Sequence, residues 1–185
     1  MSGSGASWMV GLGLCIAALS QGLMTEGAAQ ASRPIDEMRG KCDDYALDVW
    51  KELVAMEGTP GKLMTLTSRE ATPPMSPIGQ SLLVTLHNTD QVTLAATPKH
   101  GGPYAGLLAF SVPTDGSYRV SAGSAVWIDV VHGQSGVEPT QFEMQTGCAA
   151  LFKTIQYRFK KDVGYWLELS GATSTATIIL SSETR

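Results

Sequence analysis

Residues 110–122, FSVPTDGSYRVSA, and residues 157–169, YRFKKDVGYWLEL, carry the pattern that decides the fold. Placed 47 positions apart and aligned without a gap, the two segments repeat aromatic, apolar, Asp, Tyr and apolar positions in one order. Asp115 and Tyr118 coincide with Asp162 and Tyr165. Alternate residues of a strand point to opposite faces, so each segment predicts a β-hairpin with one buried face. Gene duplication and structural convergence both explain the repeat.

Further segments with a period of two surround these hairpins. Each hairpin is followed by one more strand of β-branched residues, and Gly- and Pro-containing turns separate the segments. This spacing predicts a mainly β fold, an antiparallel β-sandwich of jelly-roll type with about eight strands. We expect strands at residues 82–86, 92–96, 107–112, 118–122, 126–131, 153–159, 165–169 and 176–180.

One N-terminal helix precedes the sandwich. Apolar residues recur at helical spacing over residues 43–57, three aspartates lie near the start of this segment, and Gly58 and Pro60 end it. The Pro-rich connector that follows has room for a short strand at residues 62–67. We therefore divide the chain into an N-terminal segment at 1–31, a helix and connector at 32–80, and the β-sandwich at 81–185.

The N-terminal segment has the composition of a signal peptide. Residues 8–19 are an apolar run too short to span a membrane, and Ala29-Gln30-Ala31 is an A-x-A cleavage motif. We expect cleavage after Ala31 and a periplasmic location. Residues 1–7 contain no Lys or Arg, which leaves an uncleaved anchor as an alternative. Lipidation at Cys15 is a further alternative, although Leu14 stands where a small residue is preferred.

Cysteine usage agrees with export. Removal of the signal peptide leaves only Cys42 and Cys148, an even pair in an oxidising compartment. We predict a disulfide that joins the start of the helix to the sheet, with two unpaired buried thiols as the alternative. No spacing of Cys and His resembles a zinc site, and we predict no metal.

Composition and motifs exclude several functions. The net charge is −4, without a Lys/Arg cluster that would indicate a nucleic-acid surface. The sequence contains no G-x-S-x-G, no Walker loop and no H-E-x-x-H. We therefore assign no catalytic residue and no cofactor. A small metal-dependent or hydrolytic enzyme, with a site on the loops at His100 and His132, is the alternative.

The candidate binding residues lie on the strand at residues 126–131. Trp127 and Asp129 share one face of this strand, and His132 follows at its end. Val126, Ile128 and Val130 form the apolar face that belongs in the core. An aromatic ring beside a carboxylate suits a sugar or another small polar ligand. The structural alternative is a Trp packed under a loop with an Asp bonded to a backbone amide.

One further pattern extends over most of the mature chain and comprises residues 106–108, Phe110, Val112-Pro113, Gly116, residues 118–120 and 127–131, Phe142, Cys148, Lys153 and residues 170–172. It resembles the pattern of a family of small exported proteobacterial proteins of unknown function. The hairpins are also distantly similar to the jelly-roll domains appended to secreted peptidases, which are accessory modules. The resemblance implies export and a β fold without an activity.

These patterns favour an exported, non-catalytic β-sandwich that binds an unknown protein or a small polar ligand in the cell envelope. An envelope-complex subunit held by an uncleaved N-terminal anchor is the other alternative. We expect contact with the membrane only in that case, and none with nucleic acid.

Overall fold

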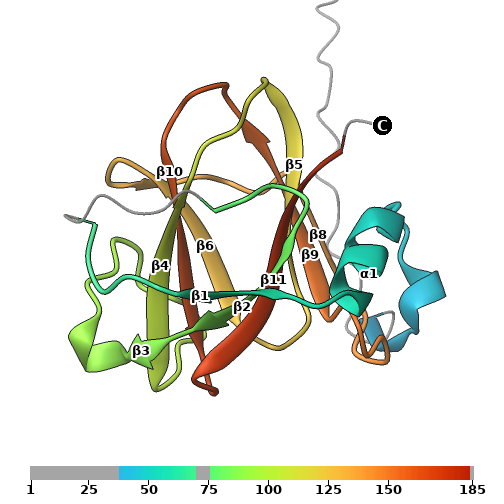
Figure 1. Ribbon diagram of the computed structural model, residues 1–185, viewed down its shortest axis with the longest axis horizontal. Helices are drawn as coiled ribbons and strands as arrows, with labels where there is room; N and C mark the ends of the chain where they lie inside the picture. The colour runs from blue at the N-terminus through green and yellow to red at the C-terminus, as the bar shows by residue number, and fades with distance from the viewer. Residues whose placement is uncertain (1–37, 70–75, 184–185) are drawn as a thin grey trace, which may run out of the picture. The chain divides into compact units, whose positions relative to one another are not determined.

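A computed structural model describes residues 38–69 and 76–183 and shows two β-sheets packed face to face (Figure 1). The six-stranded sheet has the order β1-β2-β11-β5-β9-β8, and the five-stranded sheet has the order β3-β4-β10-β6-β7. The strands are β1 (Gly61–Met64), β2 (Ser81–Thr85), β3 (His87–Asn88), β4 (Tyr104–Phe110), β5 (Gly116–Ala122), β6 (Trp127–His132), β7 (Ser135–Gly136), β8 (Gln141–Met144), β9 (Lys153–Phe159), β10 (Tyr165–Gly171) and β11 (Thr175–Ser182).

The predicted β-sandwich with one α-helix is confirmed. The described residues contain eleven strands, because β1 corresponds to the short strand expected at residues 62–67, β3, β7 and β8 are short additions, and one predicted strand is absent. Residues 92–96 are a loop that follows the 3-10 turn η3 (Thr89–Gln91). The Glu168 carboxylate accepts hydrogen bonds from the amides of Ala95 and Ala96, at 2.8 and 3.0 Å. These bonds turn the loop backbone toward a side chain instead of a neighbouring strand.

The prediction of two hairpins is wrong, because the strands of each pair lie in different sheets. β4 belongs to the five-stranded sheet and β5 to the six-stranded sheet, and β9 and β10 divide in the same way. Each connection is therefore an arch across the core. The strands pair between the repeats, β4 with β10 and β5 with β9.

The two arches bond to each other. The side chain of Asp115 in the first arch accepts a 2.7 Å hydrogen bond from the amide of Lys161 in the second. The amide of Asp162, a residue with a left-handed φ of 57°, donates to the carbonyl of Val112 at 3.0 Å. These turn residues act between the repeats, which explains why a local turn signal gave the wrong pairing.

Strand registers reveal a pseudo-two-fold relation between the repeats. Tyr165 lies opposite Phe110 where β10 meets β4, and Tyr118 lies opposite Tyr157 where β5 meets β9. A shift of 47 residues converts each pair into the other. The third strands also correspond, since β6 pairs with β10 as β11 pairs with β5. The relation exchanges the two sheets.

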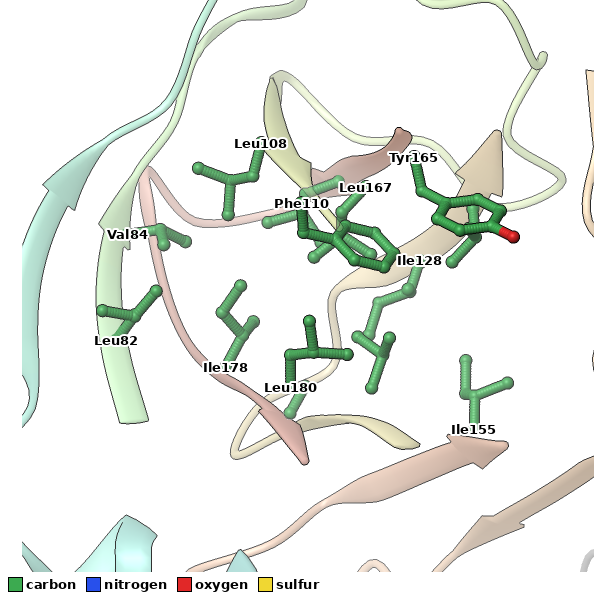
Figure 2. Close-up of a cluster of buried hydrophobic side chains, with 14 of the residues drawn as sticks. Leu82, Val84, Leu108, Phe110, Ile128, Ile155, Tyr165, Leu167, Ile178 and Leu180 are labelled. Carbon is green, nitrogen blue, oxygen red and sulfur yellow. The ribbon is translucent and has the colours of Figure 1, made fainter. Parts of the chain in front are cut away.

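The core lies between the inner faces of the sheets (Figure 2). Leu82, Ile178 and Leu180 extend into it from the six-stranded sheet, and Leu108 and Leu167 from the five-stranded sheet. A cluster of aromatic rings from both repeats occupies one part of it, with centroid distances from 4.6 Å for Phe159–Tyr165 to 5.9 Å for Tyr118–Phe159.

The N-terminal helix is shorter than predicted. α1 covers Trp50–Glu57, and a 3-10 turn, η2, covers Cys42–Asp44. Between them, the Glu143 side chain accepts hydrogen bonds from the amides of Ala46 and Leu47 at 2.7 and 3.0 Å. Bonds of this kind replace the helical bonds that these amides would otherwise make. The predicted apolar stripe also fails in part, because Trp50 is 71% exposed.

A buried ion pair attaches α1 to the six-stranded sheet. Glu52 is fully buried, and its Oε1 accepts a 2.8 Å hydrogen bond from Nε of Arg119 on β5. Ser181 of β11 donates its hydroxyl to the same oxygen. The helix thus meets the sheet through a carboxylate, which apolar periodicity alone does not reveal.

The predicted disulfide between Cys42 and Cys148 is present, with a Cα–Cα distance of 4.6 Å. Closing a loop of this size in the unfolded chain corresponds to about 4–5 kcal/mol. We expect the Cys42→Ala/Cys148→Ala variant to lose up to this amount of unfolding free energy in urea denaturation. Dithiothreitol is the matched control: it should destabilise the wild type and leave the variant unchanged. Two alkylatable thiols in the non-reduced wild type would contradict the assignment.

We expect Glu52→Ala to lower the unfolding free energy by about 3–5 kcal/mol, because the buried Arg119 guanidinium keeps its charge without its carboxylate. Glu57→Ala, at an exposed position of the same helix, should change it by roughly 0.5 kcal/mol or less. Urea denaturation followed by circular dichroism measures both. Replacing Glu52 and Arg119 together by Leu should recover most of the loss, and an equal loss in the double variant would argue against an unpaired charge as the cause.

Candidate functional site

Trp127 and Asp129 meet on the outer face of β6. Both side chains are half-buried, and Nε1 of Trp127 donates a 2.7 Å hydrogen bond to Oδ2 of Asp129. Their contact follows from the period of two along the strand. The ring of His100 approaches Trp127 edge-on, at a centroid distance of 5.2 Å.

The structure does not bring His132 to this pair. His132 lies at the opposite end of β6, where its Nδ1 donates a 3.0 Å hydrogen bond to the carbonyl of Gly164. Its ring packs against Tyr165 at a centroid distance of 5.6 Å. It therefore belongs to the second arch and not to the surroundings of Trp127.

Lys153 joins Trp127 and Asp129 from the other sheet. It begins β9 on the inner face of the six-stranded sheet, is 7% exposed, and places Nζ 5.7 Å from the centre of the Trp127 ring. Sequence reasoning missed it because this contact depends on how the sheets are stacked. The available signal was a lysine in phase with the core residues Ile155 and Tyr157.

A cleft of about 320 Å³ opens where these residues meet. It lies at one edge of the sandwich, between β6 of the five-stranded sheet and β8 and β9 of the six-stranded sheet. We call it the β6 cleft. Its polar lining includes Lys99, Asp129, Glu138 and Lys153, and its apolar lining includes Val137, Phe142 and Ile155.

Burial shifts the titration of groups in the β6 cleft. Desolvation lowers the pKa of Lys153 to about 8, partly opposed by the negative charge of Asp129. Desolvation also raises the pKa of Asp129, against the hydrogen bond from Trp127 and the charges of Lys153 and Lys99. The pKa of Tyr157 is raised mainly by burial. The cleft therefore holds an amine that is partly neutral just above neutral pH.

This arrangement suits recognition. A Trp ring supplies flat apolar surface, and Asp129 and Lys153 supply an acceptor and a donor that converge on the cleft. The ammonium lies over the ring face, a geometry that also favours a cation at this position. Burial strengthens both polar groups as specificity elements, because a ligand that leaves them unpaired is disfavoured.

The three histidines occupy separate places: His87 bonds the Thr65 carbonyl at 2.7 Å, and His100 and His132 lie near opposite ends of β6. Within residues 38–69 and 76–183, no three His, Cys, Asp or Glu side chains gather as metal ligands would. In those same ranges no helix is long and apolar enough to cross a bilayer. The predicted signal peptide at 1–31, its cleavage after Ala31, the anchor alternative and Cys15 lie outside the described residues.

No family model, curated protein or solved structure matches the chain. Its function therefore has to be inferred from the fold and from the chemistry of the β6 cleft.

We expect Lys153→Met to be more stable than the wild type at pH 7, by up to roughly 3 kcal/mol, since the pKa of this amine falls from 10.5 to about 8 on folding. Between those pH values the unfolded chain binds more protons than the folded chain, so wild-type stability rises with pH. The advantage of the variant should shrink over this window in urea denaturation series. Lys62→Met, at an exposed lysine, controls for the substitution itself. A constant difference from pH 7 to 10 would contradict the burial of a titrating amine.

Proposed function

We propose that the protein is an exported, non-catalytic β-sandwich that binds a ligand or partner in the cell envelope through the β6 cleft. The observation that carries the proposal is the convergence of Trp127, Asp129 and Lys153, from two sheets, on one open cleft. Its volume, about 320 Å³, falls within the roughly 300–1,000 Å³ that ligand sites occupy.

Two features support a binding role. An aromatic ring with a few convergent polar groups in a partly apolar concavity is the usual composition of a recognition site. Burial of Lys153 also opposes folding at neutral pH, because it disfavours the charged amine and so lowers its pKa. Groups that are unfavourable for stability and face an open cleft are candidates for function.

Two further features support export. Ala29-Gln30-Ala31 follows an apolar segment of signal-peptide length. The Cys42–Cys148 disulfide joins the N-terminal part of the described chain to the sandwich, and bonds of this kind persist in oxidising compartments. We expect the processed protein to begin at Ser32, which N-terminal sequencing of the periplasmic fraction measures.

The binding role is tested with the protein purified from an exporting bacterial host. We screen it against a glycan array and a library of displayed peptides, and expect a ligand whose affinity falls about 30-fold or more in Trp127→Ala, the loss typical of a central aromatic contact. Trp50→Ala, at an exposed tryptophan on α1, is the matched control and should bind within about twofold of wild type. Ligands unaffected by Trp127→Ala, or no ligand of either class, would overturn the proposal.

A further inference from the structure

The first four of the six residues of β6, Trp127 to Val130, lack a neighbouring strand on the side of the cleft. β7 pairs with β6 only at Val131 and His132, and the last hydrogen bond of this edge runs from the amide of Val137 to the carbonyl of Val130, at 2.7 Å. The chain then passes through Pro139, which has no amide to donate, and enters β8 in the other sheet. Residues 127–130 therefore pair with β10 on one side and, among the described residues, have no partner strand on the side that borders the cleft.

The pseudo-two-fold relation shows what occupies the corresponding place in the other sheet. β11, the counterpart of β6, has a hydrogen bond from the amide of Gly79 to the carbonyl of Leu180, also at 2.7 Å. Beyond that bond, β2 runs antiparallel to β11, with Leu82 opposite Ile178 and Leu83 opposite Thr177. The counterparts of Ile178 and Thr177 in β6 are Ile128 and Trp127. The β6 cleft thus lies where the relation would place a strand equivalent to β2.

The space on the core side of β2 is filled, whereas the space at the corresponding position beside β6 is open. Next to β2, the chain at Thr65 fills the space in front of Gly106, where an added Cβ would lie 2.0 Å from the Thr65 hydroxyl. The counterpart of Gly106 is Lys153, whose side chain borders the cleft. Phe142 of β8 remains 47% exposed beside it.

Backbone polarity at β6 suits an added strand. The carbonyl of Val130 points away from β10, since it accepts from Val137. Ile128 is two residues earlier on the same strand, so its amide and carbonyl point the same way. The edge thus offers one donor and one acceptor at Ile128, in the middle of the unpaired stretch.

We infer that the free edge of β6 binds an extended peptide segment of a partner protein as an added antiparallel strand. The inference rests on the proposed binding function and assigns its ligand class. Alternate peptide side chains should be apolar and enter beside Phe142 and Val137, as Leu82 and Val84 of β2 enter the core. The intervening side chains face Asp129 and Lys99, which favour polar partners of either charge.

A second copy of the chain fits this edge less well. Four residues correspond to about 13 Å of strand. A stable dimer commonly buries roughly 1,200–2,000 Å². The loop at Lys99 on one side and Phe142 on the other confine the edge to a cleft. A single extended peptide fits this short, confined edge and does not need the larger buried area of a dimer.

The test uses the best binder from a displayed library of nine-residue random peptides, resynthesised with a methyl group on one backbone nitrogen at a time. Methylation of the peptide amide that donates to the carbonyl of Ile128 should lower affinity about 30-fold or more, and methylation of the amides directly before and after it, which point away from β6, should change it less than threefold. Phe142→Ala should weaken binding about tenfold. Met64→Ala, at an exposed side chain of the edge strand β1, is the control.

Amide hydrogen exchange by NMR supplies a second measurement on the protein. The Ile128 amide should exchange faster in the free protein than in the peptide complex, because the bound peptide protects it. A peptide in which no methylation-sensitive amide lies between two insensitive ones, or one that leaves Ile128 unprotected, would overturn strand addition. If that peptide still depends on Trp127, the proposed binding function stands.

If a glycan binds in a Trp127-dependent manner and no peptide binds, strand addition is likewise overturned and the proposed binding function stands. Concentration-dependent protection of Ile128 in the free protein would identify a second copy as the occupant and overturn the inference. No ligand in either screen would overturn both proposals.

Discussion

The antiparallel pairing between the two repeats is the constraint on which the rest of the structure depends. Neither repeat forms a sheet by itself, since its first two strands lie on opposite sides of the core. Each becomes part of a sheet only by pairing with the other repeat, and the arches are joined by the bonds of Asp115 and Asp162. The aromatic rings of Phe110, Phe159 and Tyr165 lie in contact across the core. Sandwich, core and site geometry therefore form together, through contacts far apart in sequence.

Buried carboxylates hold the covering segments on the outer faces of both sheets. Glu52 reaches from α1 to Arg119 and Ser181 on the six-stranded sheet. Glu168 reaches from the five-stranded sheet to the amides of Ala95 and Ala96. Charged groups at such positions fix orientation more than they add stability, because desolvation offsets much of their attraction. The β6 cleft lies at an edge of the sandwich, away from these two covering segments' carboxylate contacts.

The alternating pattern was sufficient to predict the sandwich, because a strand with one buried face has a period of two whichever strand it pairs with. It was insufficient to predict pairing: Asp115-Gly116 has the composition of a hairpin turn and forms part of an arch. The predicted start of the helix was wrong for a similar reason. The amides of Ala46 and Leu47 donate hydrogen bonds to the Glu143 carboxylate, which is almost a hundred residues away in the sequence. Local helix propensity does not take account of a hydrogen-bond acceptor that only the tertiary fold brings close.

The candidate site, too, could be predicted only where it depends on local pattern. Trp127 and Asp129 were predicted together because strand periodicity is local, whereas His132 has the opposite parity and lies at the far end of β6. Lys153 could not be placed, because its position depends on the stacking of the sheets.

The pseudo-two-fold relation then distinguishes scaffold from site. The counterparts of Trp127 and Asp129 in β11 are Thr177 and Ile179, on a strand covered by β2 and α1. In β6 the same two positions carry a ring and a carboxylate, and they face a cleft. The repeats agree where they build the sandwich and differ where one of them remains accessible, so functional specificity is to be sought at the difference.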